Sequence, residues 1–154
     1  APPPSFYTVE HYDWRRDPLS DLANTIVEAR RDRKTVILQV GGAWCGWCPV
    51  LERTFKQTPR VADALRNDFL VMKVNVSHEN PNDRFLSQLP PIRSYPHLFA
   101  FDGEANLLGS QDGSMLESER GGYSERAILA LLELWRPERE DAPQRTQSAQ
   151  STAE

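Results

Sequence analysis

Two cysteines, Cys45 and Cys48, are the residues whose type and spacing most clearly offer chemistry. They stand three apart, directly after an apolar run typical of a strand and before a run with helical periodicity. A helix begins with unpaired backbone N–H groups and a partial positive charge, and both favour a thiolate over a thiol. Cysteines in such motifs often have a pKa of ~7 or below, against ~8.5 for a free thiol. The spacing therefore predicts a redox-active pair.

The position of each cysteine predicts its role. We expect Cys45, nearest the turn, to be the exposed attacking thiol, and Cys48, one turn into the helix, to be more buried. Disulfide exchange proceeds by attack of a thiolate through a mixed disulfide. Cys48 is placed to attack that mixed disulfide and release the client. This cycle needs no metal and no organic cofactor, but it needs a redox partner that resets the pair.

Three other interpretations of the cysteines remain open: a structural disulfide, a zinc site and unrelated core cysteines. A bridge across so short a loop restricts the unfolded chain little, so it would stabilise the fold weakly. Zinc usually takes four ligands, and none of His11, His78 and His97 stands at the spacing of a zinc ribbon or finger. A strand-to-helix turn is an unusual place for core cysteines. We expect no metal and no cofactor.

The composition limits the class of protein. The chain has 154 residues, of which 39% are hydrophobic, and this suits one domain with a modest core. The formal net charge of −4 argues against a nucleic-acid binder, which normally carries a basic excess. No window approaches the ~18 apolar residues that a membrane span needs. We expect a monomer with no nucleic-acid partner and no membrane span.

Both ends of the chain differ from its middle. Residues 1–5 are proline-rich and should be extended rather than packed. Residues 137–154 hold no aromatic or branched aliphatic side chain, so they cannot offset the entropy cost of ordering. We predict a flexible N-terminal segment over 1–5, a folded domain over 6–136 and a disordered polar tail over 137–154.

Helix signals recur along the middle of the chain. Asp17 is a favoured capping residue, Pro18 suits the first helical position, and apolar residues follow at helical spacing. Ser124 caps a last apolar-periodic run in the same way. The predicted helices cover residues 18–33, 45–56, 58–65 and 124–135, with a helical turn at 84–89.

The strand signals then set the fold class. The run 35–40, which is nearly continuous and rich in β-branched residues, and the largely apolar run 69–76 predict buried central strands. A third strand at 97–101, a turn and a fourth strand opening at Leu107 predict a hairpin, and there is room for a short strand near 6–10. Strands separated by helices pair in parallel. The order predicts an α/β fold with a central mixed sheet flanked by helices on both faces.

The sequence resembles the thioredoxin superfamily over most of residues 6–135. Three runs carry the resemblance: 36–48 with the cysteine pair, 71–76, and 92–101 with Tyr95-Pro96. The run 51–55 followed by Thr58-Pro59 is most similar to one branch, which includes bacterial extracytoplasmic thioredoxin-like proteins and the C-terminal domain of the transmembrane disulfide reductase. The resemblance implies a thioredoxin-like fold and thiol–disulfide oxidoreductase activity on protein or peptide disulfides.

The resemblance also implies a substrate-binding set around the pair. It implies a cis bond at Tyr95-Pro96, with Pro96 facing the cysteines and the preceding backbone pairing with the client like an added strand. The alternative is a trans proline that starts an edge strand. Tyr95 would flank Cys45, and residues 120–123 would lie across the groove. Trp44 and Trp47 would form an apolar surface for clients, or they would be ordinary packing aromatics.

One departure from the family concerns proton transfer. Many thioredoxins carry a buried aspartate six residues before the first cysteine, thought to handle the proton of the second. Gln39 stands there and cannot titrate, although Lys73 matches the strand lysine that partners that aspartate. Deprotonation of Cys48 must then use water or another group. Glu52, one turn beyond Cys48, is a candidate; otherwise it is a solvated carboxylate on the helix surface.

The functional prediction is a thiol–disulfide oxidoreductase that reduces protein disulfides. We expect a reductant because no residue between the two cysteines adds positive charge that would stabilise Cys45 as a thiolate. The alternatives are a redox-inactive binding or chaperone-like module with the same fold, and a zinc-carrying regulator. The Ala-Pro-Pro start and the resemblance predict a periplasmic location, with the cytoplasm as the alternative.

Overall fold

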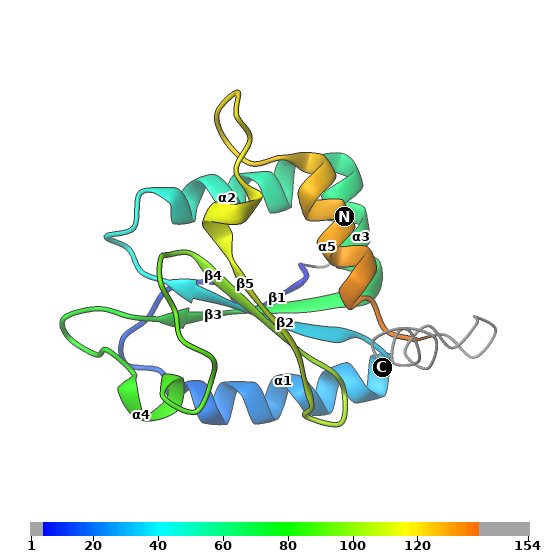
Figure 1. Ribbon diagram of the computed structural model, residues 1–154. Coiled ribbons are helices and arrows are strands. Elements are labelled where there is room, and N and C mark those ends of the chain that lie inside the picture. The colour runs from blue at the N-terminus through cyan, green and yellow to red at the C-terminus, as the bar shows by residue number, and fades with distance from the viewer. Residues whose placement is uncertain (1–4, 139–154) are drawn as a thin grey trace, which may run out of the picture.

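The computed structural model describes residues 5–138, and it places a five-stranded sheet between two layers of helices (Figure 1). The strands lie in the order β1-β3-β2-β4-β5. They are β1 (Tyr7–Val9), β2 (Thr35–Gly41), β3 (Phe69–Asn75), β4 (His97–Phe101) and β5 (Leu107–Asp112). The helices are α1 (Pro18–Asp32), α2 (Trp47–Gln57), α3 (Pro59–Asp68), α4 (Asp83–Leu86) and α5 (Glu125–Trp135), with a 3-10 helix η1 (Gly113–Leu116).

The sheet is mixed, as the element order predicted. Strands β1, β3 and β2 are parallel, whereas β4 runs antiparallel to β2 and β5 antiparallel to β4. β2 and β3 pair along their whole length, and every residue of both strands is buried. Continuous apolar runs are typical of such strands because both of their faces are covered. The α/β fold expected from the sequence, a mixed sheet with helices on both faces, is confirmed.

Each face of the sheet carries its own hydrophobic core. Side chains alternate across a strand, so Ile37 packs with Leu51 and Phe55 of α2 on one face, while Leu38 packs with Ile26 of α1 on the other. Figure 1 shows α2, α3 and α5 on the first face and α1 and α4 on the second. The first core fixes α2, the helix that carries Cys48, against the sheet.

The predicted capping residues begin their helices. The Asp17 side chain accepts a hydrogen bond from the backbone N of Leu19 at 3.0 Å, with Pro18 at the first helical position. The Ser124 side chain accepts from the backbone N of Ala127 at 3.1 Å. These caps satisfy backbone donors that would otherwise lack a partner, so the sequence signal and its physical cause agree.

The structure differs from the sequence prediction at several element boundaries. Helix α3 extends to Asp68 rather than ending at 65, and α4 spans Asp83–Leu86 rather than 84–89. Helix α2 begins at Trp47 rather than at Cys45, because Gly46 occupies the cap position, and Cys45 therefore lies in the turn before the helix. Strand β5 extends to Asp112, beyond the two leucines that signalled it, and η1 was not predicted. β5 is an edge strand with no buried residue, so its polar side chains gave no periodic signal.

The predicted boundaries of the domain, residues 6 and 136, remain a prediction. The segments predicted to be flexible and disordered lie outside the described residues except for Ser5, Pro137 and Glu138. Among residues 5–138, no helix combines the length and the apolar character that crossing a bilayer requires.

Candidate active site

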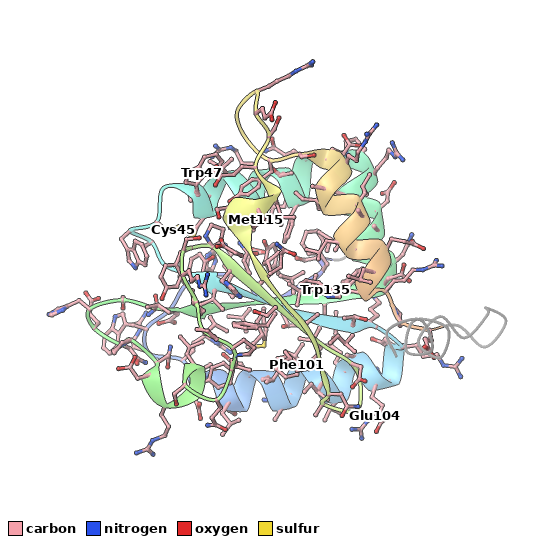
Figure 2. All side chains as sticks on the ribbon, in the orientation of Figure 1. Cys45, Trp47, Phe101, Glu104, Met115 and Trp135 are labelled. Atoms are coloured by element: carbon pink, nitrogen blue, oxygen red, sulfur yellow. A yellow bond between two sulfur atoms is a disulfide. The ribbon has the colours of Figure 1, made fainter. Side chains whose placement is uncertain are left out.

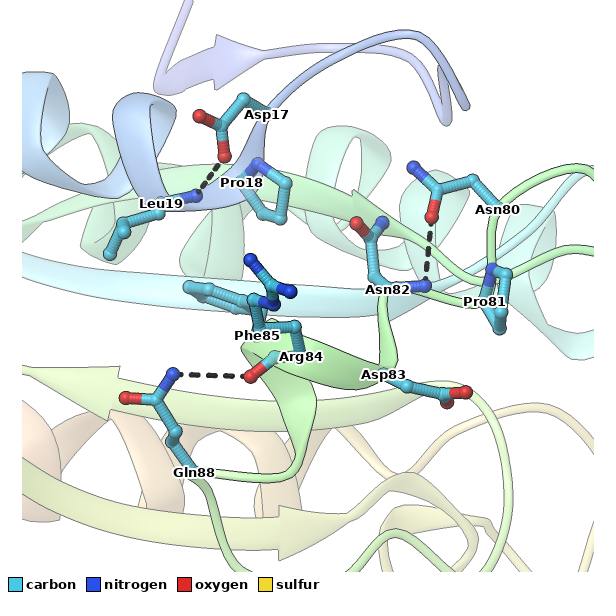
Figure 3. A pocket seen from close by; sticks show the side chains of 10 residues that line it. All are labelled: Asp17, Pro18, Leu19, Asn80, Pro81, Asn82, Asp83, Arg84, Phe85 and Gln88. Atoms are coloured by element: carbon cyan, nitrogen blue, oxygen red, sulfur yellow. Dashed lines mark hydrogen bonds between the residues drawn. The ribbon is translucent and has the colours of Figure 1, made fainter.

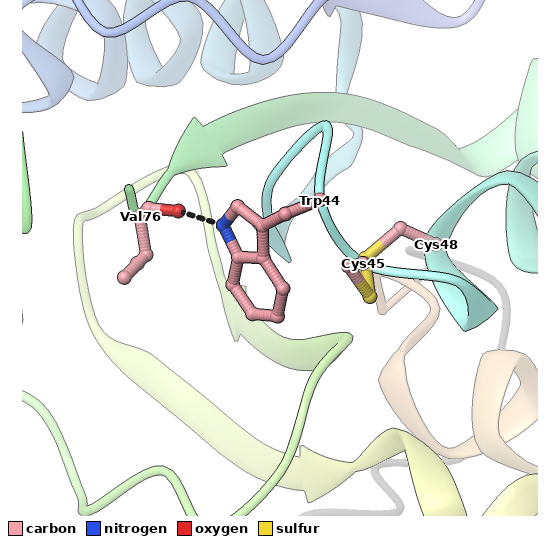
Figure 4. Close-up of a disulfide and its surroundings, with 4 residues drawn as sticks. All are labelled: Trp44, Cys45, Cys48 and Val76. Atoms are coloured by element: carbon pink, nitrogen blue, oxygen red, sulfur yellow. Dashed lines mark hydrogen bonds between the residues drawn. A yellow bond between two sulfur atoms is a disulfide. The ribbon is translucent and has the colours of Figure 1, made fainter. Parts of the chain in front are cut away.

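The two cysteines are joined in a disulfide at one end of the sheet. Their Cα atoms lie 5.4 Å apart, and Figure 4 shows the bridge between the turn after β2 and the first turn of α2. The backbone N of Cys45 donates to the carbonyl of Gly42 at 3.1 Å, which closes this turn. In Figure 2, Cys45 and Trp47 lie at the opposite end of the molecule from Glu104 and Trp135. The pair therefore lies at the carboxyl end of the parallel strands β2 and β3.

The expectation that Cys45 is an exposed thiol is wrong for the disulfide form. Cys45 is 5% exposed and Cys48 is 1% exposed. The reason is the bridge itself, which ties the Cys45 sulfur to that of Cys48, and the Cys48 sulfur packs against Gly41 at the end of β2. The predicted order of burial is still found, since Cys45 keeps the larger accessible fraction.

Gly41 is the point where β2 meets the disulfide. A Cβ atom at this position would overlap Cys48 Sγ and stand 3.0 Å from the Oη of Tyr12. Only a residue without a side chain lets helix α2 approach the strand this closely. The sulfur of Cys48 and the phenol oxygen of Tyr12 therefore flank the same small space beside Gly41.

We expect Gly41→Ala to lower the free energy of unfolding by about 2 kcal/mol, within the usual cost of overpacking. The added methyl group must displace Cys48 Sγ or the Tyr12 ring. Gly46→Ala is the matched control inside the motif, since its Cβ would meet nothing within 4 Å and its φ is −66°. Urea unfolding of the oxidised proteins measures both changes. Equal stability of the two variants would contradict the close packing of Cys48 on β2.

Trp44 covers one side of the disulfide. Its indole Nε1 donates to the carbonyl of Val76 at 2.6 Å, as Figure 4 shows, and its ring meets Tyr95 edge to face at 5.4 Å between centroids. The side chain is nevertheless 57% exposed. A large indole that is fixed in place and still open to solvent is a rigid apolar contact surface.

Trp47, which lies between the two cysteines in the sequence, forms a second aromatic pair. Its ring meets that of Tyr123 at 5.2 Å, again edge to face, and it remains partly exposed. Tyr123 ends the loop that leaves η1, where Gly121 and Gly122 adopt positive φ. The sequence predicted residues 120–123 across the groove from Tyr95, and the ring contacts place Tyr95 and Tyr123 against different tryptophans of the cysteine motif.

The bond between Tyr95 and Pro96 is cis, as the resemblance implied. The register of β4 on β2 pairs His97 with Val40, so Pro96 stands beside the end of β2 where Gly41 contacts Cys48. The carbonyl of Pro96 accepts from the backbone N of Gly113 at 3.0 Å. The structure thus brings all six predicted site residues to one end of the sheet.

A buried polar cluster lies behind the disulfide. Lys73 Nζ, on a side chain that is 5% exposed, forms an ion pair with Glu52 of α2 and lies 5.0 Å from the ring centroid of Tyr12. Tyr7 donates to Gln39 Oε1 at 2.7 Å. Gln39, Lys73 and Glu52 were recognisable from the sequence, whereas the two tyrosines were not, because neither belongs to a motif. The pairing of β1 with β3 brings in Tyr7, and the segment after β1 brings in Tyr12.

The charge of Glu52 bears on its predicted role as proton acceptor. Burial works to raise the pKa of this carboxyl, but hydrogen bonds from Lys73 and Lys56 prevail and hold the pKa below its ordinary value. A carboxylate with a lowered pKa is a weaker base. Glu52 is thus better suited to neutralise Lys73 than to take the proton of Cys48.

Neither a metal site nor a cavity away from the cysteines adds to this site. Among the described residues, no three His, Cys, Asp or Glu side chains gather as a metal site would require. A cavity of about 420 Å³ lies between the start of α1 and α4, lined by residues such as Asp17, Asn82 and Phe85 (Figure 3). It includes none of the predicted site residues, so we do not assign it to the chemistry of the cysteines.

Comparison with known proteins agrees with this architecture. A disulphide isomerase from Xylella fastidiosa Temecula1 superposes with a TM-score of 0.67 at 19% identity, covering 79% of this chain and 93% of that one. The reduced C-terminal domain of DsbD from Neisseria meningitidis gives 0.58 at 16%, covering 82% and 100%, and a DsbH oxidoreductase gives 0.53 at 16%, covering 82% and 86%. At these identities the likeness shows the fold alone.

The sequence itself places the chain in a family. No curated protein matches it at a significant level. A family model described as thioredoxin-like, however, matches residues 17–103, which include β2, the cysteine pair, β3 and β4. Because this match spans more than half of the chain and the fold agrees with it, the chain belongs to the thioredoxin-like family.

Proposed function

We propose that this protein is a thiol–disulfide oxidoreductase that reduces disulfides of protein or peptide clients. The observation that carries the proposal is the Cys45–Cys48 disulfide at the start of α2, framed by the ring pairs of Trp44 with Tyr95 and Trp47 with Tyr123. Cys45 is the nucleophile and Cys48 the resolving thiol. The rings and Pro96 form the surface that receives the client.

The reaction follows from exchange between thiolates and disulfides. In the reduced enzyme the Cys45 thiolate attacks one sulfur of the client disulfide. A mixed disulfide forms, and the other client sulfur leaves with the electron pair and takes a proton from water. The Cys48 thiolate then attacks Cys45 Sγ, which forms the internal disulfide and releases the second client thiolate. Two electrons pass to the client, and a redox partner must return them to the pair.

The proposed direction rests on what lies between the cysteines. Gly46 and Trp47 add no positive charge beside Cys45, so nothing in the motif strongly stabilises the thiolate over the disulfide. The similarity to proteins named as a disulphide isomerase and an oxidoreductase supports the chemical class. A periplasmic location is part of the proposal. It is supported by the resemblance to bacterial extracytoplasmic thioredoxin-like proteins, and cell fractionation would test it.

An insulin reduction assay tests this function. We expect the protein to accelerate the reduction of insulin disulfides by dithiothreitol. Trp44→Ala should raise KM for insulin about tenfold, because exposed tryptophans often dominate binding surfaces. It should leave the rate with a small disulfide such as oxidised glutathione within about twofold. A higher KM for insulin with an unchanged rate on oxidised glutathione would separate client binding from chemistry at the sulfurs.

Trp14→Ala is the matched control for that assay. The exposed fraction of Trp14, 50%, is similar to that of Trp44. Arg15 lies over the Trp14 ring, however, and this ring makes no contact with the aromatic rings beside the disulfide. The variant should behave like the parent with both substrates. If the parent protein binds insulin without accelerating its reduction, the alternative of a redox-inactive binding module replaces this proposal.

A further inference from the structure

Tyr12 brings a buried hydrogen-bond donor to the resolving cysteine. It lies in the segment between β1 and α1, and its phenol end packs on Gly41, with Oη 3.0 Å and Cζ 3.2 Å from the point where a Cβ would stand. The same point lies against Cys48 Sγ. The three atoms nearest to this point are Cys48 Sγ and the Oη and Cζ of Tyr12, so the sulfur and the phenol both border this space.

The hydroxyl hydrogen of Tyr12 has no acceptor within residues 5–138 in the disulfide form, although Gln39 lies close enough to the phenol to lower its pKa. The Tyr12 Oη is buried and makes no hydrogen bond of ordinary geometry within residues 5–138, and the same is true of Gln39 Nε2. Buried polar atoms are nearly always hydrogen-bonded, so an exception needs an explanation. A sulfur engaged in a disulfide is a weak acceptor, whereas a thiolate carries a full charge and accepts strongly.

The surroundings decide what the phenol can do. The titratable groups that face Tyr12 are Lys73 from β3, Glu52 from α2, Tyr7 from β1 and Tyr123 from the segment before α5. Burial raises the pKa of the Tyr12 phenol well above its ordinary range, and Gln39 lowers it by less. Tyr12 therefore keeps its proton at neutral pH and acts as a donor rather than a base.

We propose that Tyr12 donates a hydrogen bond to the Cys48 sulfur in the reduced enzyme and stabilises its thiolate, a task for which residues 5–138 hold no buried aspartate. The inference rests on the proposed function, since it concerns the step that resolves the mixed disulfide. The Cys48 thiolate attacks Cys45 Sγ, and the client sulfur leaves with the electron pair. Tyr12 neither gains nor loses a proton in this step, and the proton of Cys48 passes to water.

The direct test is the pKa of Cys48 in a chain where it is the only thiol. In the Cys45→Ser background, the ¹³C shift of the Cys48 Cβ reports ionisation without requiring solvent access. Adding Tyr12→Phe removes only the hydroxyl and should raise the Cys48 pKa by about one unit, a tenfold loss in the ionisation constant. With a cysteine at 45, the same change should lengthen the lifetime of the mixed disulfide about tenfold at pH 7.

Tyr7→Phe is the matched control. It also removes a buried phenol hydroxyl, and that hydroxyl bonds Gln39 in the same cluster, but it belongs to a different element, β1. It should shift the Cys48 pKa by less than about 0.3 unit. If Tyr12→Phe leaves the Cys48 pKa unchanged, or if Tyr7→Phe moves it equally, the proposal is overturned.

A second measurement needs no variant and so does not depend on how well Tyr12→Phe folds. In the parent protein, ¹³C labelling of tyrosine Cζ should show a shift change at Tyr12 when the disulfide is reduced, larger than that at Tyr7. An unchanged Tyr12 signal would overturn the proposed hydrogen bond between Tyr12 and Cys48.

Exchange of the parent protein with glutathione separates the two proposals. If exchange occurs and Tyr12 has no effect, only this inference fails; if no exchange occurs, the proposed function fails.

Discussion

Cys48→Ser is expected to accumulate covalent mixed disulfides with client proteins, whereas Cys45→Ser should form none. Without the thiol at 48, the bond between Cys45 and the client has no internal attacker, and it persists until an external thiol breaks it. Without the thiol at 45, the first attack is lost, and catalysed insulin reduction should fall more than about 10³-fold, as when other enzymes lose their nucleophile. Non-reducing gels and mass spectrometry of the adducts measure both outcomes.

The asymmetry between the two variants is the informative part of that experiment. Cys45 keeps slightly more accessible surface than Cys48, and it lies in the turn before α2 rather than within the helix. The double variant Cys45→Ser/Cys48→Ser gives the background of non-covalent binding. Equal trapping by both single variants would mean that the two thiols are interchangeable, and activity like that of the parent in both would remove the assigned roles altogether.

Glu52→Gln is expected to lower the free energy of unfolding at pH 7 by about 2 kcal/mol. Lys73 is almost wholly buried, and Glu52 is the carboxylate paired with it. Breaking a buried pair by removing one partner typically costs about 3–5 kcal/mol, and we expect less here because the Glu52 carboxylate is partly exposed. Chemical denaturation of the oxidised protein measures the loss.

Two control variants separate the buried contact from the exposed one. Lys56→Gln removes the other cation on Glu52, which lies at 3.1 Å on a more exposed side chain, and it should cost less than about 0.5 kcal/mol. Adding Lys73→Met to Glu52→Gln removes the unpaired charge and should restore most of the lost stability. If Glu52→Gln and Lys56→Gln lower the free energy of unfolding by equally small amounts, Glu52 does not stabilise the Lys73 ammonium.

The pH dependence of this effect has a definite sign. The pKa of Glu52 is lower in the folded chain than its ordinary value of 4.5, which stands for the unfolded chain. The ion pair therefore contributes its full stability above about pH 4.5, and the contribution disappears as the pH falls through the folded pKa. The difference in stability between the parent and Glu52→Gln should be largest near neutral pH and should shrink in acid.

The elements that position the site were predictable because each had a local physical cause. The strands at 35–41 and 69–75 are buried on both faces, and continuous apolar runs indicate such strands. The first helix was bounded by the cap at Asp17. Because the cysteine motif directly follows the strand at 35–41, these elements placed Cys45 and Cys48 at the carboxyl end of that strand.

The parts that could not be predicted depend on contacts between distant segments. The burial of Cys45 comes from the bridge and from packing at Gly41, and the motif alone carries no measure of that packing. Tyr12 lies in a polar segment with no periodic pattern, and its place beside Cys48 is set by where that segment crosses the end of β2.

The most direct test of the account is the redox equilibrium of the Cys45–Cys48 pair with glutathione, followed by alkylation and mass spectrometry. We expect a single two-electron transition between dithiol and disulfide, at a potential above about −300 mV and more negative than about −150 mV, which is the range of exchanging pairs that act as reductants. A pair that stays oxidised at every glutathione ratio, as structural disulfides do, would contradict the claim that these cysteines perform exchange.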